Sequence, residues 1–323
     1  MPRKHRLRLL IAFAAVYLIW GSTYLGIRVA IETMPPFFMA AARFLVAGTV
    51  LYGWSRLRGA PRPTRAEWRA ASIVGVLLLA GGNGGVVWAE QIVPSGLAAL
   101  IVGAEPLWVV ILDWLRPGGR RPGCVTGVGL VVGFLGVALL IAPGRGGSGV
   151  VPPLGAAALT VAIISWAIGS IYSRTAPSPA SPLMATGTKM LAGGTALAAM
   201  SLVAGEPGRF HLAAVSGRSL FALVYLIVFG AIVGFTAYLW LLQNTTLAKA
   251  STYAYVNPVV AVLLGWLILR EPLTARILLA TAIIVSGVVL ISGLPLLRSG
   301  ARRLFGGATT LPPASVPSRP ADA

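Results

Sequence analysis

The feature that most constrains this chain is a series of ten apolar runs, each about 20 residues long, separated by short breaks. A run of this length can cross the ~30 Å hydrocarbon core of a bilayer as a helix. The predicted spans are Leu9–Ile31, Pro36–Leu57, Trp68–Ile92, Gly96–Leu115, Val125–Ala142, Val151–Tyr172, Leu183–Ala204, Ser219–Gln243, Ala250–Leu269 and Leu273–Pro295. The breaks contain Pro and Gly, which end helices, and none is long enough for a soluble domain. We therefore expect an all-α integral membrane protein.

Composition excludes several classes of protein. Charged residues make up only 11% of the 323 residues, whereas soluble domains average about 25%. Cys124 is the only cysteine, and His5 and His211 are the only histidines. An internal disulfide, or a metal centre built on Cys or His, is therefore excluded. No P-loop or Ser–His pairing is present, so we expect neither a cofactor nor an enzyme.

The distribution of Lys and Arg predicts the orientation. With the N-terminus inside, 18 of the 26 basic residues fall in predicted cytoplasmic segments and five fall outside. Both termini are then cytoplasmic, as a basic N-terminus (1–8) and a disordered tail (296–323). A signal peptide is the competing interpretation of the N-terminus, but the apolar run is too long for one. The basic residues are dispersed over short loops, so the net charge of +18 does not indicate a nucleic-acid partner.

An internal repeat relates the two halves of the chain. Shifts of 146 to 152 residues align rare residue types within the spans. The aligned pairs include Trp20 with Trp166, Arg43 with Lys189, Trp88 with Trp240, and Pro106 with Pro258. Each half (9–143 and 150–295) holds five spans, so the second half enters the membrane from the opposite side. We therefore expect ten transmembrane helices as two inverted five-helix repeats around a central cavity, an architecture of secondary transporters.

Several motifs resemble one known family. The run Leu18–Tyr24, with sequence LIWGSTY, resembles the opening motif of EamA-domain proteins in the drug/metabolite transporter superfamily. Further matches are Arg43-Phe44, Asn83-Gly84, Val93–Leu100 and Ser251–Val259. The resemblance covers roughly Leu9 to Gly293 and is strongest to the YedA-like bacterial branch. It implies two EamA repeats, cytoplasmic termini, a central cavity, and the export of amino acids, related metabolites or drugs.

Polar groups inside the spans are the first candidates for substrate contact, because they are costly in a bilayer. Arg43 and Lys189 could contact an anionic group of a substrate; alternatively, each side chain reaches to the interface. Glu105 and its repeat partner Asn257 each precede a proline that kinks its span, where polar groups can line a wet cavity. Glu105 could also exchange protons, which makes protons a candidate coupling ion. The alternative for Glu105 is an ion pair with Arg43 or Lys189.

Four other polar residues have weaker claims. Asn83 lies within five residues that include four glycines, and it is either a link between helices or a cavity donor. Glu90 and Gln91 end the third span, where we expect solvation at the interface. Asp113 lies near the end of the fourth span, and we expect it to pair with a nearby Arg.

Aromatic residues complete the candidate site. Core packing is the alternative for each of them, although rings can also stack on an organic substrate or a cation. The aromatic candidates within the spans are Trp20, Tyr24, Trp88, Trp166, Tyr238 and Tyr253.

Together these features predict a secondary transporter that works by alternating access on a small organic substrate, as a monomer or homodimer in a lipid bilayer. A flippase for lipids or lipid-linked head groups, or a membrane scaffold, is the alternative. A cavity that opens laterally would favour the flippase.

Overall fold

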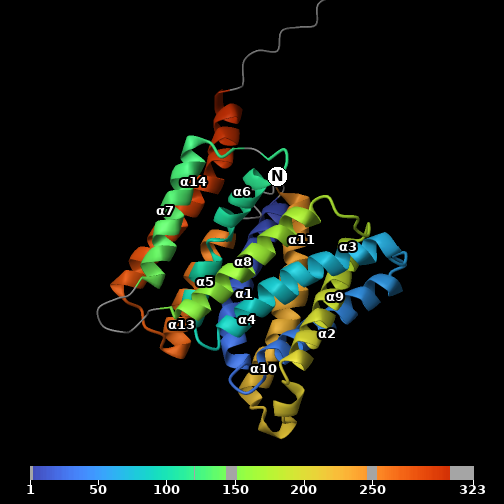
Figure 1. Ribbon diagram of the computed structural model, residues 1–323. Coiled ribbons are helices and arrows are strands. Elements are labelled where there is room, and N and C mark those ends of the chain that lie inside the picture. The colour runs from blue at the N-terminus through green and yellow to red at the C-terminus, as the bar shows by residue number, and fades with distance from the viewer. Residues whose placement is uncertain (1–2, 120, 143–150, 246–252, 306–323) are drawn as a thin grey trace, which may run out of the picture.

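The computed structural model describes residues 3–119, 121–142, 151–245 and 253–305, and within these ranges all regular structure is helical (Figure 1). The main helices are α1 (Arg3–Ala30), α2 (Pro36–Leu57), α3 (Arg65–Gly75), η1 (Val76–Asn83), α4 (Gly84–Ala89), α5 (Ser95–Val102), α6 (Glu105–Leu115), α7 (Cys124–Ile141), α8 (Pro153–Ser173), α9 (Pro182–Val203), α10 (Gly217–Tyr225), η4 (Leu226–Val233), α11 (Gly234–Asn244), α13 (Tyr253–Leu269) and α14 (Ala275–Phe305). Two single turns, η2 (Pro207–Arg209) and η3 (Leu212–Ala214), lie between α9 and α10.

The helices follow the predicted spans closely, and α2 has the predicted bounds. Two ends differ. Helix α1 already begins at Arg3, so the basic N-terminal segment is largely helical. Helix α14 continues to Phe305, past the predicted end of the last span at 295. The rest of the predicted tail, 306–323, lies outside the described residues, as does most of the break between the predicted halves (143–150).

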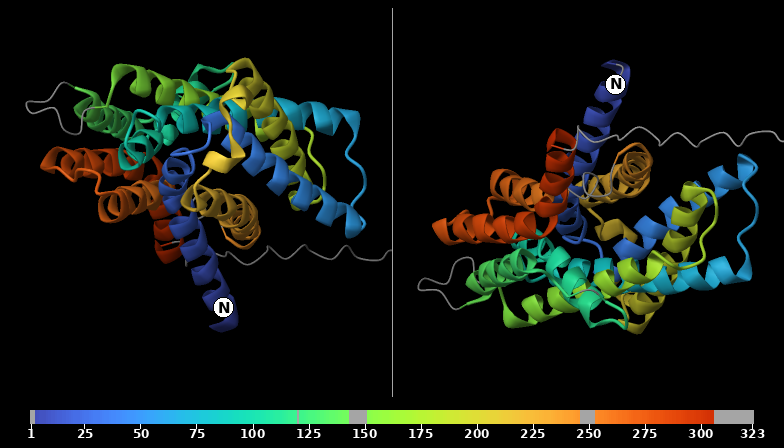
Figure 2. Two further views of the ribbon diagram at one scale, coloured as in Figure 1. Left: turned by 90° about the horizontal axis from the view of Figure 1, so that it is seen from below. Right: turned by 90° about the horizontal axis from the view of Figure 1, so that it is seen from above.

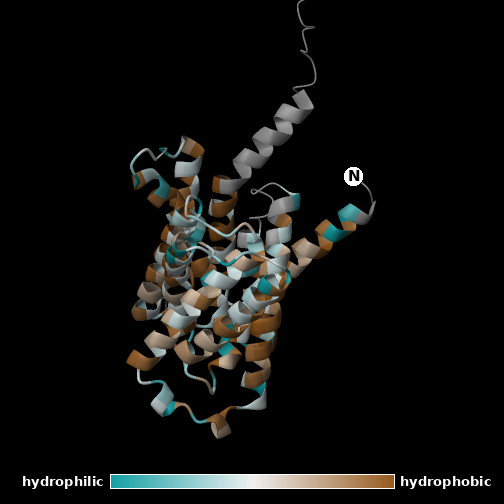
Figure 3. Ribbon diagram, turned by 90° about the vertical axis from the view of Figure 1, so that its right-hand side faces the viewer, coloured by the Kyte–Doolittle hydropathy of each residue, from teal (hydrophilic) through white to brown (hydrophobic). Residues whose placement is uncertain are grey.

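Seven helical stretches in the described ranges are long and apolar enough to cross a membrane, and two shorter apolar helices, Val256–Leu269 and Ala275–Ile291, follow. Helix α9 has 22 residues but is not among the seven, because it carries Thr186, Thr188 and Lys189 in its interior. Large apolar side chains such as Leu18 and Val161 are more than half exposed on the outer surface, as expected where lipid replaces water. Figure 3 shows apolar residues along the helices and hydrophilic ones in connecting segments.

Three of the predicted spans are irregular. The third (α3–η1–α4) and the eighth (α10–η4–α11) each have a π-helical centre of eight residues. The fourth span breaks at Gly103-Ala104, between α5 and α6. Wider helical turns and breaks of this kind occur mostly at functional positions.

Helices from the two halves interlock. Figure 1 shows α7 and α14 together on one side and α2, α9 and α3 on the other, with α1 and α8 between them. In both views of Figure 2, α1 begins outside the other helices and runs into the middle of the bundle. Glycines allow the closest approaches: a Cβ on Gly287 of α14 would lie 2.5 Å from the backbone nitrogen of Gly133 in α7.

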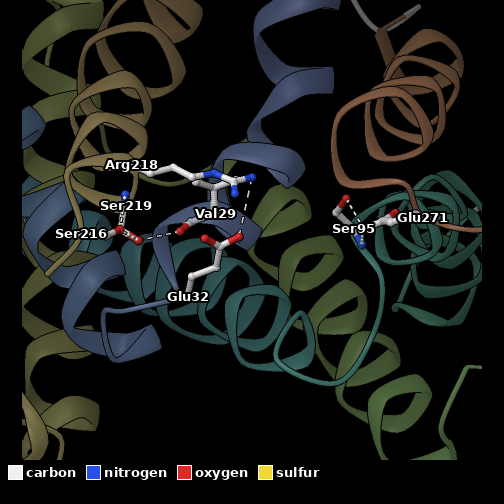
Figure 4. A network of polar contacts seen from close by, with 7 residues as sticks. All are labelled: Val29, Glu32, Ser95, Ser216, Arg218, Ser219 and Glu271. Atoms are coloured by element: carbon white, nitrogen blue, oxygen red, sulfur yellow. Dashed lines mark hydrogen bonds and ion pairs between the residues drawn. The ribbon is translucent and has the colours of Figure 1, made fainter. Parts of the chain in front are cut away.

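Carboxylates from distant segments cap two helix beginnings. Glu271, between α13 and α14, accepts hydrogen bonds from the first residues of α5 (Figure 4). Glu206, after α9, accepts from the backbone N–H groups of Phe37 and Phe38 at the start of α2. Both contacts satisfy N–H groups that a helix leaves unpaired, and both join the first half of the chain to the second.

Candidate substrate site

A cavity of about 150 Å³ lies between the helices of the two halves. Its walls come from α1, α2, η1, α4, α5, α6, α8, α11 and α13. The lining residues are Trp20, Thr23, Tyr24, Ile27, Arg43, Phe44, Leu79, Gly82, Asn83, Val86, Ala99, Val102, Gly103, Glu105, Pro106, Ala162, Ile163, Trp166, Phe235, Tyr253, Asn257 and Pro258. A cavity of this size can hold a molecule about as large as benzene.

The cavity brings together eight of the eleven residues that the sequence singles out. They are Trp20, Tyr24, Arg43, Asn83, Glu105, Trp166, Tyr253 and Asn257. The lining does not include Trp88, Lys189 or Tyr238. Trp88 packs against the apolar core formed by α4, α5 and α8, and Tyr238 lies behind Trp20, with ring centroids 5.2 Å apart.

Lys189 lies apart from the cavity even though its repeat partner Arg43 lines it. Its side chain is half-buried on α9 and borders a narrow cleft against α3 and the segment after α8. The cleft also contains Glu67 and Ser173. The pair of cationic contacts expected from the repeat is therefore not found at the cavity in this conformation.

Trp20 organises an aromatic wall. Its indole Nε1 donates to the carbonyl oxygen of Gly230 in η4, at 3.2 Å. The edge-on rings of Phe235 and Tyr253 lie 5.2 and 5.0 Å from it, centroid to centroid. These contacts fix the ring orientations, because tilted and edge-to-face aromatic pairs attract one another. On the opposite side, Trp166 lies against Gly82, where a Cβ would come within 2.7 Å of the Trp166 ring.

The break in the fourth span places a carboxyl group in the cavity. Glu105 is the first residue of α6, and Pro106 follows it, where the missing N–H of proline costs nothing. Gly103 in the break touches α13 so closely that a Cβ would lie 2.6 Å from Cγ of Pro258. The two proline-containing spans therefore meet at the cavity.

The surroundings of Glu105 contain hydroxyl groups but no cation. Among the described residues it forms no ion pair, so the expected alternative of a pair with Arg43 or Lys189 is not found. Three tyrosines, Tyr24, Tyr238 and Tyr253, interact with it electrostatically.

The side-chain amide of Asn257 hydrogen-bonds to backbone carbonyl groups. In the amide orientation that satisfies both of its polar atoms, its nitrogen donates to the carbonyl oxygens of Tyr17 and Tyr253, at 3.3 and 3.2 Å. Proline at position 258 removes one backbone hydrogen bond from α13, and the carbonyl freed is one turn earlier. The amide therefore joins α1 to the first residue of α13 at the edge of the cavity.

A buried charge cluster lies behind the cavity wall. The side chain of Arg43 is 4% exposed, and its guanidinium lies 4.8 Å from the ring of Phe44. Glu90 is 0% exposed, and neither carboxylate oxygen has a hydrogen-bond partner. Glu90 interacts electrostatically with Arg28 and Arg43, and Arg28 donates to its backbone carbonyl. The expectation that Glu90 is solvated is therefore wrong, because it lies between the buried core residues Ala89 and Val93. Gln91, in contrast, is exposed, as expected.

One other expectation has a clear outcome. Asp113 pairs with Arg116, with a nitrogen–oxygen distance of 2.8 Å, as expected. No group of three or more His, Cys, Asp or Glu in the described ranges could hold a metal ion.

Sequence reasoning missed the small and apolar part of the lining. Gly82, Ala99 and Ala162 give no chemical signal of their own, and Phe235 lies among other apolar residues. Phe44 could have been found, because it adjoins Arg43 and a ring beside a buried guanidinium is a common partner.

The chain is similar to transporters over nearly its whole length. The sequence profile of the EamA-like transporter family matches residues 7–142 and 153–293. The chain is 41% identical over 283 residues to the uncharacterized inner membrane transporter YedA of Escherichia coli strain K12, covering 87% of this chain and 89% of YedA. It is 25% identical to the uncharacterized transporter YvbV of Bacillus subtilis, over 90% of this chain and 92% of that protein.

More distant similarities extend the picture. The chain is 27% identical to the chloroplastic WAT1-related protein At3g02690 of Arabidopsis thaliana, over 85% of this chain and 67% of that protein. A solved crystal structure superposes with a TM-score of 0.61 at 22% identity, covering 93% of this chain and 99% of the other. That likeness concerns the fold.

Proposed function

Because the chain belongs to the EamA-like transporter family and is a membrane transporter, we propose that it moves small organic metabolites as a secondary transporter by alternating access. The substrates are amino acids, related metabolites or drugs, and the direction is export across a bacterial inner membrane with both termini cytoplasmic. The observation that carries the proposal is the cavity itself, because polar and aromatic residues from both halves of the chain converge there.

The helix contacts support two inverted five-span repeats. Helix α1 packs on α10, η4, α11 and α13, and its repeat partner α8 packs on the equivalent α3, η1, α4, α5 and α6. Helix α2 packs against its partner α9, and α7 against its partner α14. The π-helical centres are also equivalent, since η1 and η4 begin at positions 76 and 226 and both have eight residues. Inverted halves of this kind can exchange conformations and so expose one site to either side of the membrane.

Flux into proteoliposomes tests the proposal. Purified protein should accelerate the movement of at least one compound from a panel of radiolabelled amino acids, amines and drugs, with and without a proton gradient. No flux above empty liposomes for the whole panel would refute transport of soluble metabolites. Movement of labelled lipid head groups without such flux would instead support the flippase alternative.

A variant that fills the cavity tests whether the transported compound passes through it. Val102 lines the cavity, so Val102→Trp should fill most of the space and abolish flux. The control is Val128→Trp on α7, since Val128 is 55% exposed on the outer surface. Lys189→Ala should also leave flux nearly unchanged, because its side chain lies outside the cavity. Equal losses in both tryptophan variants, at equal amounts of folded protein, would show that this cavity is not the route.

A further inference from the structure

The guanidinium group and the carboxyl group at the cavity differ in the charged groups that surround them. Of the described lining residues only Arg43 and Glu105 have a guanidinium or a carboxyl group. The sequence suggested that cations would dominate this site, through Arg43 and Lys189. In the structure Lys189 is elsewhere, and the cavity has one cation and one carboxyl group.

Arg43 interacts electrostatically with a carboxyl group that does not line the cavity, although among the described residues it forms no ion pair and its Nε and Nη1 have no hydrogen-bond partner. Arg43 interacts electrostatically with the fully buried Glu90, which interacts in turn with Arg28 and Glu271. The cluster contains two arginines and two carboxylates and is formally neutral. Glu271 is also satisfied by the N-terminus of α5. A substrate carboxylate would therefore have to compete with Glu90 for Arg43.

Glu105 has no oppositely charged partner among the described residues. Among the residues described it has no ion pair, no cation acts on it electrostatically, and it receives no side-chain hydrogen bond. Three tyrosines interact with it electrostatically, and it lines the cavity at the break between α5 and α6. A carboxylate in a site screened from water attracts a cation strongly, because few water molecules compete for it.

The remaining wall suits an organic cation. Trp20, Tyr24, Trp166, Phe235 and Tyr253 line the same cavity as Glu105. Tyr24 and Tyr253 also interact with Glu105 electrostatically. Aromatic faces attract ammonium groups through their quadrupoles and bury the apolar part of a ligand. We propose that this cavity selects protonated amines of about the size of benzylamine, with the Glu105 carboxylate as their counter-ion. This inference rests on the proposed function and specifies its substrate class.

Three probes of equal shape test the charge preference. Benzylamine, benzyl alcohol and benzoate each carry one aromatic ring but differ in charge. Binding is measured by calorimetry on the purified full chain in detergent. Benzylamine should bind about 10- to 100-fold more tightly than benzyl alcohol, the range that a charge-assisted hydrogen bond supplies, and benzoate should bind most weakly. Phenylglycine, which adds a carboxylate to benzylamine, should bind more weakly than benzylamine because that carboxylate would have to compete with Glu90 for Arg43.

Variants assign the preference to Glu105. Glu105→Gln should reduce benzylamine binding to the level of benzyl alcohol, and Glu105→Asp should keep part of the preference. The matched control is Glu32→Gln, which removes a partly exposed carboxylate that pairs only loosely with Arg218, at 3.8 Å. Thermal unfolding and gel filtration confirm that each variant is folded. Equal binding of the three probes, no binding of any at millimolar concentration, or an unchanged preference in Glu105→Gln would overturn the proposal.

Glu90 provides a second, independent test. Glu90→Gln should expose the charge of Arg43 to the cavity, so the ratio of benzylamine to benzoate affinity should fall by about tenfold or more. An unchanged ratio in a folded variant would overturn the assignment of Glu90 as the counter-ion. Flux of anions without amine binding would refute this inference but keep the proposed function. Amine binding through Glu105 with no flux of any compound would keep this inference but refute the proposed function.

Discussion

Glu271 should be one of the most sensitive positions outside the cavity, because one carboxylate holds the start of α5. Its Oε1 accepts from the backbone N–H and the hydroxyl of Ser95, at 2.7 and 2.8 Å, and its Oε2 accepts from the N–H of Gly96, at 2.9 Å (Figure 4). The carboxylate also fills the space beside Gly265, where a Cβ would collide with it. Helix α5 forms part of the cavity wall, so this cap connects stability with the site.

The three hydrogen bonds predict how much stability each variant should lose and in what order. Each bond to a charged acceptor contributes about 1.5–3 kcal/mol, and bonds in one network do not add fully. Glu271→Ala should therefore lower the free energy of unfolding by at least about 3 kcal/mol. Glu271→Gln keeps an acceptor for Ser95 but sets an NH₂ group against the N–H of Gly96, so it should cost less than Glu271→Ala. Ser95→Ala loses one bond and should cost least, about 1 kcal/mol.

Equilibrium unfolding in mixed micelles of dodecyl maltoside and SDS measures this order. Glu32→Ala is the control, because its loose ion pair with Arg218 is partly exposed and should contribute less than about 1 kcal/mol. The reasoning fails if Glu271→Ala is no less stable than Glu32→Ala. It also fails if Ser95→Ala costs as much as Glu271→Ala, since the hydroxyl alone would then account for the contact.

Two further predictions concern contacts between the halves. Trp20→Phe should cost about 1 kcal/mol more than Trp108→Phe, because only Trp20 has an indole hydrogen bond among the described residues; equal losses in mixed-micelle unfolding would contradict this. Gly287→Ala should destabilise by about 1–3 kcal/mol because its Cβ would collide with the backbone of α7. The control Gly127→Ala, which meets nothing within 4 Å, should be neutral or stabilising, and a stable Gly287→Ala would show that the crossing can open.

Hydropathy, together with the positions of Pro and Gly, predicted the helices well, for a physical reason. The bilayer sets the length of an apolar run, and Pro and Gly mark where the run ends. The predicted second span has the bounds of α2, and the predicted fifth differs from α7 by one residue at each end. The ends of α1 and α14 were missed because a helix can continue into water beyond the apolar run, and hydropathy does not detect such extensions.

The site was harder to predict, because sequence gives the depth of a residue in the membrane but not the direction of its side chain around the helix axis. The repeat in the sequence aligns Arg43 with Lys189, yet only Arg43 lines the cavity. Under the proposed alternating access, two related halves need not have the same conformation at one moment, so aligned residues can have different surroundings. Glu90 shows the same limit, since nothing near it in sequence indicates that later segments bury it.

Departures from regular helix are the best guide to this cavity in the sequence. Asn83 ends η1, Glu105 begins α6 after a break, and Asn257 precedes the proline of α13. Irregular backbone in a bilayer persists only where protein or trapped water satisfies its polar groups. Three such positions on different spans must therefore face inward, and they can share one polar space only if the spans converge. In a chain with 11% charged residues, Gly and Pro inside apolar runs consequently locate the polar interior more directly than the charged residues do.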